Sequence, residues 1–134
     1  MNVKIDTKEK FSVITPEVSE LTANMSDNLL NLLQSYLQKE IPHIVLNLKN
    51  VQQIDENVMD AIVNEQQSFY QENFSFVICC LHADIIAKLE DKEYLDSMNM
   101  TPSESEAWDI VQMEEIEREL LNDFDDNQKM NTQH

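Results

Sequence analysis

The segment from His43 to Val58, HIVLNLKNVQQIDENV, constrains the fold more than any other part of the sequence. Its first half contains closely spaced apolar residues, which predict a buried strand: Ile44, Val45, Leu46 and Leu48. An apolar pattern with helical spacing begins at Val58. The segment therefore predicts a strand connected to a helix through a short junction, and this junction carries Asp55 and Glu56.

We expect Asp55 and Glu56 to lie at the start of that helix. Aspartate is a preferred N-cap residue because its carboxylate accepts hydrogen bonds from the free backbone N–H groups of the first helical turn. A glutamate in this turn is stabilised by the positive end of the helix dipole. The sequence therefore places two negative charges at one exposed strand-to-helix junction.

The composition fits one globular domain. The chain has 134 residues, of which 42% are hydrophobic and 26% are charged, so it can bury a core without disulfide bonds. No apolar run approaches the roughly 20 residues that cross a bilayer, and the first residues lack the apolar centre of a signal peptide. We expect a cytoplasmic protein without membrane insertion.

The chain is strongly acidic, with 26 acidic and nine basic side chains and a net charge of −17. Nucleic acid and anionic membranes would repel it, so we exclude both as direct ligands and expect a protein partner that presents Lys or Arg. Ten Asp or Glu and one Arg fall between Ser103 and Asp126, a local balance of −9. This segment is predicted to be a solvated helix face and a solubilising tail, with a dedicated docking surface as the alternative.

Apolar spacing predicts strands that alternate with helices. The predicted elements are a hairpin of Asn2 to Ile5 and Phe11 to Thr15, helices from Asn24 to Glu40 and Asn57 to Glu72, a strand from Phe74 to Leu81, a short helix from Asp84 to Leu89, an edge strand near Met100 and a final helix that Ser103 opens with a Ser103–Glu106 capping box. The fold class is α/β (α+β), a mixed β-sheet of roughly four to five strands with about four helices packed on it. The domain spans residues 1–121, and we expect the acidic, polar tail at 122–134 to be disordered.

Glycine is absent from the sequence. Any left-handed backbone conformation must therefore fall on other residue types, of which Asn and Asp tolerate it best. Asn50, Asn73 and Asp91 are the predicted positions.

No catalytic or metal-binding arrangement is predicted. Asp55 and Glu56 are adjacent at a helix start and do not face each other, and the sequence suggests no cleft beside them, so no catalytic residue is assigned. Cys79 and Cys80 point to opposite faces of a strand and cannot share one tetrahedral metal site with His82. We expect no metal and no cofactor, and a chain without glycine has no phosphate-binding loop.

The order of these elements resembles the STAS domain, the fold of bacterial anti-sigma-factor antagonists. The strand HIVLNL, the V-x-x-I-D pattern that ends at Asp55 and the late segment SESEAW carry the resemblance, which covers Val3 to Leu120. Members of the family have Asp-Ser-Ser-Gly at the start of this helix. The resemblance implies a regulator of transcription and signalling that binds protein partners and is not an enzyme.

The sequence departs from the family pattern directly after Asp55. In the partner-switching members, an anti-sigma kinase phosphorylates the serine at this place, and phosphorylation breaks the complex. Here Glu56 occupies the phosphoserine place, Val58 replaces the usual glycine, and no Ser, Thr or Tyr occurs between Leu37 and Gln67. By this resemblance, Glu56 is the equivalent of the phosphosite but cannot be phosphorylated. It either mimics phosphoserine permanently, or binds a partner that has adapted to glutamate, or only stabilises the helix start.

The resemblance implies an anti-sigma-factor-antagonist-like interaction module that works independently of phosphorylation. Its partner, an anti-sigma factor, a kinase-like protein or another regulatory protein, would contact six consecutive residues: Asp55, Glu56, Asn57, Val58, Met59 and Asp60. Whether the chain also forms a homodimer stays open. Two alternatives remain: a scaffold or transporter-associated STAS subunit that docks through its acidic terminal helix, and a small-molecule-sensing STAS domain with a pocket among its helices.

Overall fold

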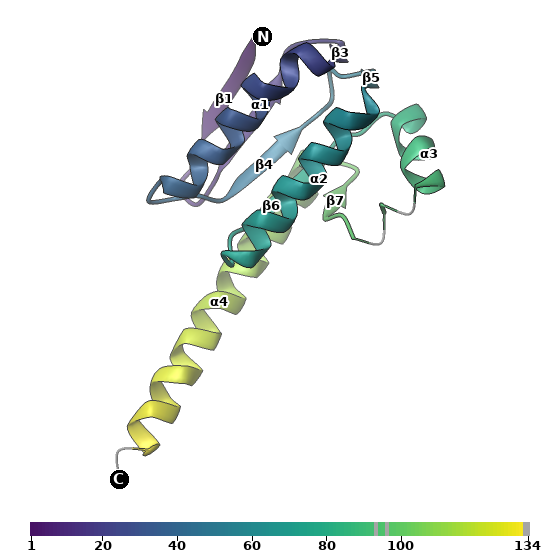
Figure 1. Cartoon of the computed structure of the whole chain (residues 1–134). Helices are drawn as coiled ribbons and strands as arrows, with labels where there is room; N and C mark the ends of the chain where they lie inside the picture. The colour runs from purple at the N-terminus through teal and green to yellow at the C-terminus, as the bar shows by residue number, and fades with distance from the viewer. Residues whose placement is uncertain (93, 96, 133–134) are drawn as a thin grey trace.

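The computed structural model describes residues 1–92, 94–95 and 97–132, and it is built around a five-stranded mixed sheet with the strand order β1-β2-β4-β6-β7 (Figure 1). In chain order the elements are β1 (Val3–Thr7), β2 (Ser12–Pro16), β3 (Glu20–Leu21), α1 (Ala23–Ser35), the 3₁₀ turn η1 (Tyr36–Gln38), β4 (Ile44–Asn47), β5 (Gln53–Ile54), α2 (Glu56–Gln71), β6 (Phe76–Cys79), α3 (Ala83–Asp91), β7 (Met100–Thr101) and α4 (Glu104–Thr132). The predicted fold class is confirmed.

The sheet combines one hairpin with a parallel core. β1 and β2 pair antiparallel, as the sequence predicts, and the pairs β2–β4, β4–β6 and β6–β7 are parallel. Parallel neighbours need a crossover connection, and the helices α1, α2 and α3 provide the three crossovers. The predicted edge strand near Met100 is β7.

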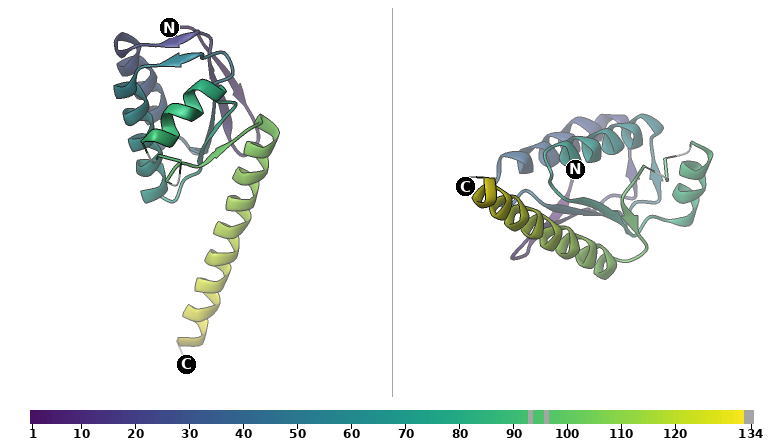
Figure 2. Two further views of the ribbon diagram at one scale, coloured as in Figure 1. Left: turned by 90° about the vertical axis from the view of Figure 1, so that its right-hand side faces the viewer. Right: turned by 90° about the horizontal axis from the view of Figure 1, so that it is seen from below.

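The central strands are buried on both faces. Val45 lies in register with Val13 and Val77, and this row packs against α4, whereas Leu46 lies in the next row and packs against α1 and α2. α1 and α2 cover one face of the sheet and α4 lies against the other (Figure 2). Burial on both faces explains why these strands read as continuous apolar runs rather than alternating ones.

A second, two-stranded sheet fixes the junction before α2. β3 and β5 pair in parallel, with Leu21 opposite Ile54. The backbone N–H of Asp55 donates to the carbonyl oxygen of Leu21 (2.9 Å), and that of Gln52 donates to Ser19 (2.7 Å). The start of α2 is thereby tied to the chain that precedes α1.

One of the three predicted left-handed positions is correct. Asn73 has a φ of 62° and follows the end of α2, where the Phe74 N–H donates back to the carbonyl oxygen of Phe69 (2.8 Å). Asn50 and Asp91 do not adopt a positive φ, so these two predictions are wrong. Cys80 takes that conformation instead, with a φ of 64° at the end of β6.

α4 begins after the predicted N-cap residue, Ser103, which forms one of the two hydrogen bonds of a capping box. The Ser103 hydroxyl accepts the backbone N–H of Glu106 (3.3 Å) and donates to the Glu106 carboxylate (3.1 Å). The helix continues to Thr132, past the boundary at Asn122 that the sequence predicts, because no glycine or proline interrupts this segment. Residues 133–134 lie outside the described residues.

A polar cluster joins α4 to the amino ends of β4 and β6. The Ser75 N–H donates to His43 Nδ1 (3.0 Å), so Nδ1 carries no proton in this arrangement. Nε2 of His43 lies 3.4 Å from Glu115 Oε2, and Arg118 donates to Ser75 Oγ (3.1 Å) and to Glu115 Oε2 (2.9 Å). Burial, and secondly the Arg118 guanidinium, lower the pKa of His43 below its usual 6.5, although Glu115 opposes the shift. His43 is therefore held as the neutral imidazole.

Lowering the pH should weaken the folded state through His43. The pKa of His43 is lower in the folded than in the unfolded chain, so the unfolded chain binds the proton first as the pH falls. The contribution of His43 to the free energy of unfolding is therefore complete above pH 6.5 and is lost as the pH falls through the pKa of the folded chain. His43→Asn keeps an acceptor for the Ser75 N–H, because the amide oxygen of asparagine can take the place of Nδ1. We expect it to flatten the dependence of the unfolding free energy on pH between about 7.5 and about 5.5. Urea unfolding at several pH values measures this, and identical pH dependence in both proteins would contradict a neutral His43.

Candidate functional site

The start of α2 is an exposed, negatively charged junction, as the sequence predicts. Asp55 is the N-cap residue, and its Oδ1 accepts the backbone N–H of Asn57 (2.9 Å). Glu56 is the first residue of the helix, and its side chain is 64% exposed. Glu56 therefore carries an ionised group in solvent at the positive end of the helix dipole.

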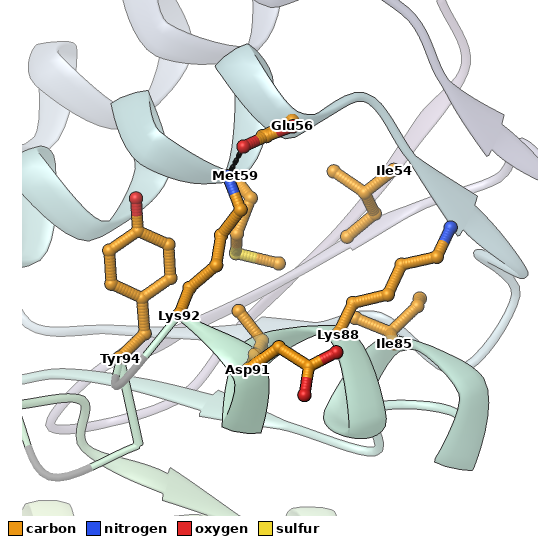
Figure 3. A pocket seen from close by; sticks show the side chains of 9 residues that line it. Ile54, Glu56, Met59, Ile85, Lys88, Asp91, Lys92 and Tyr94 are labelled. Atoms are coloured by element: carbon orange, nitrogen blue, oxygen red, sulfur yellow. Dashed lines mark ion pairs between the residues drawn. The ribbon is translucent and has the colours of Figure 1, made fainter.

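Glu56 forms an ion pair with Lys92, the residue that caps the carboxyl end of α3 (Figure 3). The Lys92 side chain is 36% exposed, so both partners are accessible to water. Exposed pairs of this kind stabilise a fold by only about 0–1 kcal/mol. The pair can therefore open at little cost when another cation approaches Glu56.

The six residues predicted to contact a partner divide into two groups. Asp55, Glu56 and Asn57 are exposed and Asp60 is half-buried, whereas Val58 and Met59 are only 1% and 5% exposed. Val58 packs in the core beneath α2 and offers no surface. Two of the six predicted contact residues therefore offer almost no surface to a partner.

A cavity of about 300 Å³ lies between the start of α2 and α3 (Figure 3). Its apolar wall comes from Ile54 and Met59 on one side and from Ile85 and Leu89 on the other. Polar side chains complete the lining: Glu56, Lys88, Asp91, Lys92 and Tyr94. The sequence suggests no cleft beside the junction, and this expectation is wrong. The cavity forms because α3, which follows α2 only after β6, packs beside the start of α2, and the local sequence does not reveal this contact.

Asp60 is hydrogen-bonded to Tyr94, one of the residues that line this cavity. The Tyr94 hydroxyl donates a hydrogen bond to Asp60 Oδ1. This bond to a carboxylate, together with desolvation and the negative charge of Asp60, raises the pKa of Tyr94 above its usual 10.0. One carboxylate oxygen of Asp60 is thus occupied within the chain, whereas the Glu56 carboxylate is held only by its exposed ion pair with Lys92.

The other chemistry-bearing residues serve the fold. The ring Nε2 of His82 lies 2.8 Å from the carbonyl oxygen of Lys49 and ties the loop after β4 to the start of α3. Cys79 and Cys80 are free thiols. Within residues 1–92, 94–95 and 97–132, no group of three or more His, Cys, Asp or Glu side chains could hold a metal ion. Over the same described residues, no helix is long and apolar enough to span a membrane.

Solved structures share this architecture at low sequence identity. A Thermotoga maritima protein proposed to be an anti-sigma factor antagonist aligns with a TM-score of 0.74 and 19% identity, covering 82% of this chain and 94% of that one. RsbS of Moorella thermoacetica, solved as a serine-to-glutamate variant, gives 0.68 and 15%, covering 84% and 96%. The anti-sigma factor antagonist SpoIIAA gives 0.63 and 13% in its unphosphorylated form, covering 83% and 98%, and 0.62 and 12% in the phosphorylated Bacillus form, covering 82% and 99%.

Sequence comparison places the chain in a family directly. Among curated proteins, none matches the sequence significantly. The family model of the STAS domain matches residues 2–107, which include the whole sheet, the junction before α2 and the start of α4. The match extends over well more than half of the 134 residues. The chain therefore belongs to the STAS domain family.

Proposed function

We propose that this STAS domain is a non-enzymatic regulatory module of the anti-sigma-factor-antagonist type, which binds a protein partner through the start of α2. The observation that carries the proposal is the exposed carboxylate of Glu56 beside the Asp55 N-cap, at the place where the family resemblance puts a phosphorylatable serine. The partner is an anti-sigma factor, a kinase-like protein or another regulatory protein of a cytoplasmic signalling pathway.

Recognition by this module is independent of phosphorylation. Glu56 carries its negative charge permanently, and no hydroxyl side chain from Leu37 to Gln67 can take a phosphate in its place. The mimicry of phosphoserine is partial, because a phosphoserine carries about −1.5 to −2 charges and three acceptor oxygens, against one charge and two oxygens for glutamate. SpoIIAA, by contrast, has both an unphosphorylated and a phosphorylated form.

A partner that binds Glu56 has to break the ion pair between Glu56 and Lys92. A basic side chain of the partner has to replace the Lys92 ammonium, which is weakly held because the pair is exposed. A bidentate arginine would gain from this exchange, since its planar guanidinium bonds both carboxylate oxygens. The released Lys92 can then pair with an acidic group of the partner.

The cavity between α2 and α3 supplies the apolar part of the contact. Because Val58 and Met59 are buried, no apolar side chain projects from the start of α2, and the partner has to contribute the apolar anchor. A leucine, methionine or phenylalanine side chain would fit the volume of about 300 Å³ and would contact Met59 and Leu89. The partner surface thus combines one apolar anchor with a neighbouring Arg or Lys.

The same cavity favours a second candidate, a small-molecule-sensing STAS domain. Its volume stands at the lower end of the range for ligand pockets, and its apolar wall carries polar groups at the mouth. A ligand taken there would raise the thermal midpoint of unfolding without any protein partner.

The charge at residue 56 is expected to decide partner binding. The full chain is first used as bait to capture partners from the native cell, and these are purified. They should bind the Glu56→Lys variant at least about tenfold more weakly than the wild-type chain, because the reversed charge repels their basic side chain. Glu72→Lys makes the same charge change at the exposed far end of α2 and is the matched control. Titration calorimetry measures both, and equal affinities of the two variants would show that the junction is not the interface.

Glu56→Ser separates phospho-mimicry from helix stabilisation. If the glutamate stands in for a phosphoserine, the serine variant should bind like the opposite, unphosphorylated state, and phosphorylation by a cognate kinase should return binding to the wild-type level. Phosphate incorporation and affinity are measured on the same samples. Incorporation of phosphate with no effect on affinity in either form would leave Glu56 only its role in stabilising the start of α2.

A further inference from the structure

The first half of α4 has two different faces. Ala107 and Val111 are completely buried against the sheet, and Arg118 reaches back to hydrogen-bond Ser75 at the amino end of β6 (3.1 Å). These residues define the side of the helix that docks on the domain. Beyond Arg118 the helix runs away from the sheet, and the side chains of residues 119–122 are all exposed (Figures 1 and 2).

The opposite side of α4 carries an apolar stripe formed by Met113, Ile116 and Leu120. Two positions along an α-helix correspond to a rotation of about 200°, so Met113 lies opposite Val111, and Ile116 and Leu120 both lie opposite Arg118. Their spacing of i, i+3 and i+7 places all three on one line along the helix. The stripe therefore cannot contact the sheet while α4 stays docked.

The stripe is open to solvent over its whole length. Met113 is 59% exposed, Ile116 56% and Leu120 62%, and Leu121 beside the stripe is also 62% exposed. Single exposed apolar side chains are common, but a row of them on one helix face marks an interaction surface. Helices recognise partners through apolar anchors at this spacing.

Charge decides which kind of partner fits the stripe. Asp109, Glu117 and Glu119 flank it, and the segment from Ser103 to Asp126 has a balance of −9. A second copy of α4 laid along the stripe would bring two such segments within about 10 Å, a distance comparable to the screening length of about 8 Å at physiological salt. Like charges at that distance oppose self-association, whereas Lys and Arg on a partner helix would pair with the flanking carboxylates.

We propose that the stripe Met113–Ile116–Leu120 docks a basic amphipathic helix of a second protein. The stripe lies on the face of the sheet opposite to α1 and α2, so this partner and one bound at the start of α2 can be held at the same time (Figure 2). The domain would then link two proteins. This inference stands without the proposed role of Glu56.

A synthetic amphipathic helix tests the proposal on the full chain. The probe is a fluorescent peptide of about five helical turns, with Leu at i, i+3 and i+7 and Lys elsewhere, and its control has the same composition with the Leu residues spread around the helix. Fluorescence anisotropy should show saturable binding of the amphipathic peptide that weakens as salt rises, and at least about tenfold weaker binding of the scrambled peptide. Equal binding of both peptides, or no binding of either, would overturn the proposal.

Variants then locate the contact on α4. The triple change Met113→Ser, Ile116→Ser and Leu120→Ser should weaken binding of the amphipathic peptide at least about tenfold, whereas Asn122→Ser, at an exposed position on the opposite side of the helix, should not. The thermal midpoint of the triple variant checks that the domain stays folded. Unchanged affinity of a folded triple variant would refute the stripe as the contact. A wild-type dimer in light scattering that the triple variant breaks would assign the stripe to a second copy instead.

Discussion

Burial of β4 on both faces is the constraint on which the other elements depend. Ile44 and Leu46 pack beneath α1 and α2, and Val45 packs beneath α4, so each of these side chains is completely removed from water. Burying one such side chain stabilises a fold by about 1.5–3 kcal/mol. Because side chains on both faces of β4 are buried, the strand is fixed in place together with its carboxyl end. The short connection through β5 then determines where α2 begins.

The candidate site is a consequence of this rigid framework. The pairing of β3 with β5 and the Asp55 cap hold the backbone at the start of α2, while α3 closes the cavity beside it. Only the charged side chains at the mouth are loosely held, since Glu56 and Lys92 pair in solvent. A fixed backbone with exchangeable ion partners suits recognition of another protein better than chemistry on a substrate.

Local signals in the sequence predicted most of the fold and the position of the junction. The apolar runs gave the two central strands, Asp55 marked the start of α2, and the Ser103–Glu106 spacing marked the start of α4. Long-range features could not be predicted in this way: the two-residue strands β3 and β5, the ion pair of Glu56 with Lys92 and the cavity all depend on segments far apart in the chain. The burial of Val58 and Met59 could have been predicted from the sequence, because Ile62 follows them at helical spacing and so lies on the same face of α2.

Hydrogen–deuterium exchange of the chain, alone and bound to its purified partner, tests most directly whether the start of α2 is the interface. Most amides of the first turn of α2 have no backbone partner within the helix, and Asn57 is bonded only to the exposed Asp55 side chain, so their exchange reports a partner that covers them. If the start of α2 is the interface, partner binding slows exchange in the peptides that contain Glu56 to Asp60 and in those from α3. Protection that leaves both regions unchanged and falls elsewhere on the domain would contradict it.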